Sequence, residues 1–60
     1  MYEIVAPGRV PVVVHWQTRP RLVILRALVS ESQMEIELTP EQARSLANML
    51  IDGAGLAERS

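Results

Sequence analysis

The chain has 60 residues with no cysteine and one histidine, which excludes a disulfide framework and leaves one subunit without the ligands of a structural zinc site. A domain of this length buries only about 60% of its unfolded surface, so self-association is the remaining means of stabilisation. The formal net charge is −1, but the first half is basic and the second acidic, a pattern compatible with a nucleic-acid surface or with head-to-tail contact between subunits.

The first half of the chain predicts two strands. Residues 2–5 are β-prone, and Pro7-Gly8 has the signature of the centre of a type II turn. Residues 10–17 are rich in β-branched side chains, and Pro11 lies near the start of the segment, where a strand tolerates proline.

A third strand is expected over residues 21–29, which are apolar on both alternations. The leucine spacing also fits a helix, but the β-branched residues and the turn residues on either side favour a strand. Residues 34–38 alternate strictly between apolar and polar, which predicts a half-buried fourth strand after a polar turn over residues 30–33.

Residues 40–52 predict a capped amphipathic helix. Thr39 and Gln42 have the spacing of a capping box, and Pro40 occupies the first helical position. The apolar residues form one stripe, consisting of Ala43, Leu46, Ala47, Leu50 and Ile51. Gly53 is a natural residue to follow a helix, so residues 53–60 are expected to form a frayed tail, with Met49 and Leu56 as secondary contacts if the helix continues.

These elements predict an α+β fold, a three- to four-stranded antiparallel meander with the helix packed on one face. With four-residue turns, Arg26 lies opposite Glu37, and Trp16 points inward with Val10, Val12 and Val14, where the helix stripe covers them. A three-residue turn after the second strand would instead send Trp16 outward.

One helix cannot cover both faces of such a sheet. The outer face keeps apolar side chains around Arg26, and contiguous apolar surface on a small domain usually marks an interface. The predicted contact with a second subunit, in a homodimer, or with a partner protein consists of Val13, Leu22, Ile24, Arg26 and Leu28.

No pattern of residues predicts catalysis, a cofactor or a metal. His15 has no second histidine or cysteine to complete a metal site, and no serine lies in a nucleophile motif. Glu35 and Glu37 share one face of a strand, but alternating glutamates are a common protection against aggregation of an exposed strand. The segment Gly53-Ala54-Gly55 lacks the lysine of a phosphate-binding loop.

A second hypothesis concerns nucleic acid. Arginine side chains at or near the turns could contact phosphates if dimerisation doubled the patch, although no helix-turn-helix pattern accompanies them. The candidate contacts are Arg9, Arg19, Arg21 and Arg26.

The segment LTPEQARSLANML, residues 38–50, resembles the C-terminal part of small actinobacterial and actinophage proteins in which strands precede a helix of this kind. The resemblance implies an origin in a high-GC host or its virus, in keeping with six arginines and no lysine, and implies no activity. No signal peptide or membrane span is recognisable, so we expect a cytoplasmic protein. We expect residues 1–60 to form one domain. Because no catalytic pattern is present, we expect that this domain is not an enzyme and acts by binding another protein.

Overall fold

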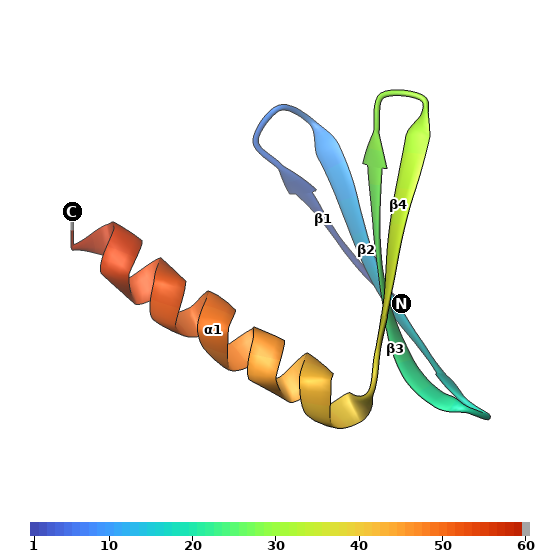
Figure 1. Ribbon diagram of the computed structural model, residues 1–60. Coiled ribbons are helices and arrows are strands. Elements are labelled where there is room, and N and C mark those ends of the chain that lie inside the picture. The colour runs from blue at the N-terminus through green and yellow to red at the C-terminus, as the bar shows by residue number, and fades with distance from the viewer. Residues whose placement is uncertain (60) are drawn as a thin grey trace.

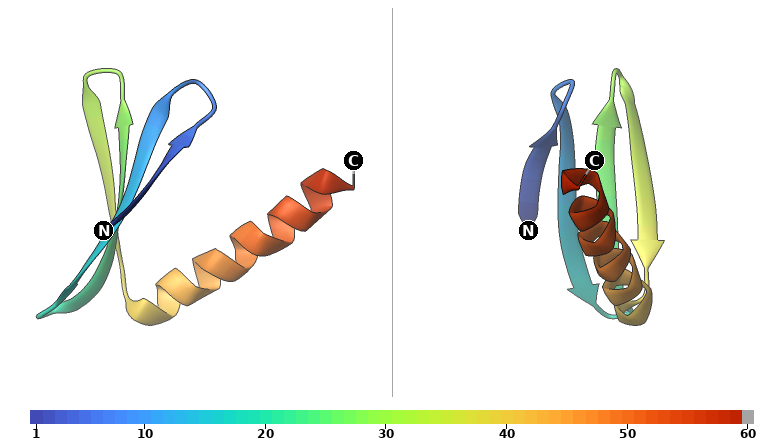
Figure 2. Two further views of the ribbon diagram at one scale, coloured as in Figure 1. Left: turned by 180° about the vertical axis from the view of Figure 1, so that it is seen from behind. Right: turned by 90° about the vertical axis from the view of Figure 1, so that its left-hand side faces the viewer.

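The computed structural model describes residues 1–59. Its elements are β1 (Tyr2–Ala6), β2 (Val10–Thr18), β3 (Arg21–Val29), β4 (Ser32–Leu38) and α1 (Pro40–Glu58). The strands form one antiparallel sheet in the order β1-β2-β3-β4, and α1 lies on one side of it (Figures 1 and 2). The predicted α+β meander with a C-terminal helix is confirmed, and residues 21–29 form a strand.

The first hairpin has the predicted turn. Gly8 has a φ of +86°, as the third residue of a type II turn requires, and the amide of Arg9 donates a hydrogen bond to the carbonyl of Ala6 at 3.0 Å. Arg9 continues in the left-handed region, with a φ of 62°, before β2 begins.

The other two turns are shorter than predicted. Thr18 pairs with Arg21 around Arg19-Pro20, and Val29 pairs with Ser32 around a turn in which Ser30 has a φ of 56°. The prediction of a four-residue turn over residues 30–33 is therefore wrong, because a two-residue turn suffices when its first residue takes a positive φ.

This shorter turn slides β4 by two residues along β3, so Arg26 lies opposite Glu35 and not opposite Glu37. Since side chains alternate with a period of two, a slide of two residues leaves every side chain on its predicted face. Trp16 accordingly shares the inner face with Val14 and Leu25, as predicted.

The start of α1 is the predicted capping box. The Gln42 amide donates to Thr39 Oγ1 at 3.1 Å, and the Thr39 amide donates to Gln42 Oε1 at 3.0 Å.

The predicted end of the helix is wrong, because α1 continues through Gly53 and Gly55 to Glu58 and residues 53–58 are not a frayed tail. A helical glycine costs only about 1 kcal/mol relative to alanine, which the good helix formers Ala54, Leu56 and Ala57 can offset. Arg59 follows as the C-cap residue, and residue 60, the last of the predicted tail, lies outside the described residues.

The helix covers little of the sheet. It begins at the end of β4, contacts β3 and β4, and then points away from the sheet toward its C-terminal end (Figures 1 and 2). Leu50, in the middle of the apolar stripe, is 65% exposed. Trp16 is 53% exposed, so the prediction that the helix stripe covers it on the inner face is wrong.

Candidate interaction surface

The predicted interface residues do share the outer face of the sheet. Val13 lies opposite Arg26, and Ile24 lies between His15 and Glu37 on the neighbouring strands. Ile24 is only 8% exposed, however, and is the one buried apolar residue in the described chain, whereas Leu28 is 45% exposed. Of the predicted interface residues, Ile24 is thus already covered within one chain.

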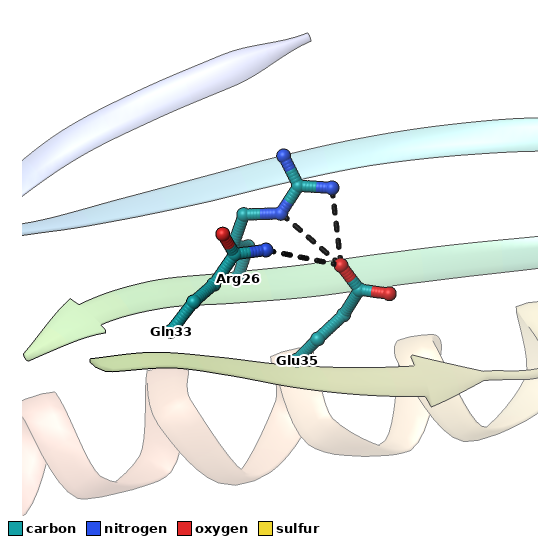
Figure 3. A network of polar contacts seen from close by, with 3 residues as sticks. All are labelled: Arg26, Gln33 and Glu35. Atoms are coloured by element: carbon teal, nitrogen blue, oxygen red, sulfur yellow. Dashed lines mark hydrogen bonds and ion pairs between the residues drawn. The ribbon is translucent and has the colours of Figure 1, made fainter. Parts of the chain in front are cut away.

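A polar network of Arg26, Gln33 and Glu35 lies on this face (Figure 3). Arg26 Nη2 and Nε lie 3.0 and 3.2 Å from Glu35 Oε2, and Gln33 Nε2 donates to the same oxygen at 3.5 Å. Both charged side chains are more than one-third exposed, so the ion pair contributes at most about 1 kcal/mol. Its effect is to hold the Arg26 guanidinium against a carboxylate.

The four arginines proposed for nucleic-acid contact do not form one patch. Arg9 lies in the β1–β2 turn, whereas Arg19 and Arg21 lie at the β2–β3 turn at the opposite end of the sheet (Figure 1). The nine residues of β2 separate these turns by roughly 26 Å. The structure therefore brings only Arg19 and Arg21 together, and Arg26 is held by Glu35.

The least covered region is the angular space between the inner face of the sheet and α1, which we call the wedge. One hollow of about 220 Å³ lies between β2, β3, β4 and α1 and is lined by eight apolar residues, with Leu25, Leu46 and Leu50 among them. A second hollow of about 170 Å³ extends it toward β1, where Tyr2, Ile4 and Val12 line it together with Leu50.

Large apolar side chains of the wedge and its rim are exposed to solvent. Each has between 43% and 72% of its surface accessible. They are Tyr2, Ile4, Trp16, Val29, Met34 and Ile36 on the inner face, and Met49, Leu50, Ile51 and Leu56 on α1. The rings of Tyr2 and Trp16 lie with their centroids 5.6 Å apart and form an aromatic pair on this face. This surface has no signature in the sequence, because it exists only where α1 points away from the sheet instead of packing along it.

The dimensions of the molecule agree with this open arrangement. Its accessible surface is 5301 Å², whereas a compact chain of this mass exposes about 3,900 Å². The radius of gyration is 13.0 Å, compared with about 10 Å for a compact domain of this length. Each chain thus exposes an excess of about 1,400 Å².

The chemically reactive side chains are dispersed. Among residues 1–59 no three histidine, aspartate or glutamate side chains lie together as a metal site would require. His15 Nε2 is buried without a hydrogen-bond partner, but no second titratable group pairs with it in that part of the chain. No helix in residues 1–59 is both long and apolar enough to span a membrane.

Comparison with known proteins gives no assignment. No family model matches the chain, and neither a curated protein nor a solved structure matches it. The resemblance of residues 38–50 to actinobacterial and actinophage proteins stays a prediction.

Proposed function

We propose that the protein is a small non-enzymatic interaction module that works as a homodimer and binds another protein, as an accessory protein of a high-GC bacterium or its phage. The observation that supports dimerisation is the excess surface of about 1,400 Å² per chain. Two chains that buried this excess against each other would remove about 2,800 Å², which lies in the range of obligate homodimers.

The outer face is the surface that we propose for the protein partner. It combines an apolar rim, including Val5 and Leu28, with the polar network of Arg26, Gln33 and Glu35. A mixed surface of this kind is typical of interfaces between proteins that also exist apart.

Solution mass tests the dimer. Light scattering over a range of micromolar concentrations should give twice the mass of the chain. A stable monomer throughout that range contradicts the proposal.

For the partner, immobilised wild-type protein and a Leu28→Glu variant should be compared against host lysate. A specific partner should be captured by the wild type and lost with the variant, and equal capture by both would remove the outer face from consideration.

The alternative function, nucleic-acid binding, depends on Arg19 and Arg21, which lie together at one end of the sheet. Two copies would double this pair of charges. Duplex DNA binding that weakens steeply with added salt and is lost in an Arg19→Ala, Arg21→Ala double variant would support it. Absence of binding at low salt excludes it.

A further inference from the structure

We infer that the second copy of the chain occupies the wedge, so that the inner face and α1 of one chain close on the inner face and α1 of the other around one shared hydrophobic core. This inference rests on the proposed homodimer and specifies which surface forms it.

The distribution of exposed apolar side chains points to the wedge. The inner face and α1 carry most of the large apolar residues that solvent reaches in the described chain, whereas Val5 and Leu28 are those on the outer face. The outer face has Ile24 closed at its centre, but Leu50 in the wedge is 65% exposed although it lines both hollows. The area that lacks a cover is therefore on the inner side.

The helix has a wider apolar surface than its own sheet can use. At about 100° per residue, its apolar side chains extend over roughly 200° of the circumference, from Met49 on one flank to Ile51 on the other. A helix packed on a single sheet typically needs a stripe of about 100°. The two flanks of α1 therefore require apolar partners that its own chain does not supply.

The polar side of α1 restricts the direction from which the second copy can pack against the helix. Arg44, Asn48 and Asp52 share the strip opposite the residues that face the sheet. A partner placed on this strip would have to take two charged side chains and an amide out of water, which is costly. The second copy must instead enter through the open side of the wedge, with the polar strips of both helices left in water.

Pairing at the unpaired edge of β1 is the competing arrangement. It would satisfy the backbone of β1, where Tyr2, Ile4 and Val5 are exposed beside a single carboxylate, Glu3. It would leave Leu50 and Trp16 in solvent, however, and so would not remove the excess apolar surface. A two-fold arrangement of two wedges covers both, and the same patch on each chain makes the contact isologous.

Trp16 gives a test that needs no substitution, because it is the only tryptophan and is 53% exposed in the single chain. In a dimer closed at the wedge, its emission should be blue-shifted and protected from acrylamide, and dilution to monomer should reverse both effects. A dimer with a solvent-exposed Trp16 overturns the inference and leaves the proposed homodimer intact. A monomer with an exposed Trp16 overturns the inference and the proposed homodimer. A monomer with a protected Trp16 also overturns them, because the wedge then closes without a second copy.

Three glutamate variants locate the interface. Leu50→Glu should weaken dimerisation at least 100-fold, whereas the matched controls Asn48→Glu on the polar strip and Leu28→Glu on the outer face should keep the mass of a dimer. A folded Leu50→Glu variant that dimerises like the wild type overturns the inference, and a monomeric Leu28→Glu variant beside it would place the contact on the outer face instead. If Leu50→Glu does not fold, the Trp16 measurement on the wild type still decides the question.

Discussion

At the scale of single residues, the turns contain the backbone conformations that depend most on residue type. Gly8 has a φ of +86°, and no atom lies within 4 Å of the position that a β-carbon would occupy. Replacing Gly8 by alanine therefore introduces conformational strain without a steric clash. We expect Gly8→Ala to lower the free energy of unfolding by about 1 kcal/mol, as measured by urea denaturation at a fixed protein concentration.

Gly55 provides the matched control for this substitution. It lies in the helical part of the chain, and a β-carbon added there would also meet no atom within 4 Å, so alanine gains helix propensity at no steric cost. Gly55→Ala should raise the free energy of unfolding by up to about 1 kcal/mol. Changes of the same sign in the two variants would show that the φ of Gly8 is not what constrains the first turn.

At the scale of elements, the capping box fixes where β4 ends and α1 begins, and therefore the closed end of the wedge. Thr39→Ala removes the oxygen that accepts from the Gln42 amide and should cost about 1 kcal/mol of stability. Thr39→Ser keeps the hydroxyl and should stay within about 0.5 kcal/mol of the wild type. Thermal unfolding followed by circular dichroism measures both, and an equal loss in the two variants would assign the effect to the Thr39 methyl group instead.

The sequence predicted the type and order of the elements because their signals are local. The capping box, the Pro7-Gly8 turn and the alternation over residues 34–38 each depend on neighbours within four residues. The register of β4 was wrong by two residues, because the positive φ that allows Ser30 to complete a two-residue turn has no signature in its residue type. The apolar surface around Leu50 was missed for another reason: it depends on the angle between α1 and the sheet, which periodicity does not contain.

At the scale of the whole molecule, a single chain has almost no interior. Ile24, at 8% exposure, is the only buried apolar residue in the described part of the chain, and it lies on the opposite side of the sheet from the helix. Hydrophobic burial is the main term that offsets the conformational entropy of folding. A chain that obtains most of this burial from a second copy should therefore fold and associate in one step.

This coupling makes stability depend on protein concentration. For two chains that unfold and separate together, the enthalpy of unfolding is about 80 kcal/mol per dimer, at about 0.7 kcal/mol per residue. The midpoint of thermal unfolding should then rise by about 6 °C for each tenfold increase in protein concentration. Calorimetry over two decades of concentration measures this slope. A midpoint independent of concentration would mean that one chain is stable by itself, and the exposed wedge would then belong to a monomer.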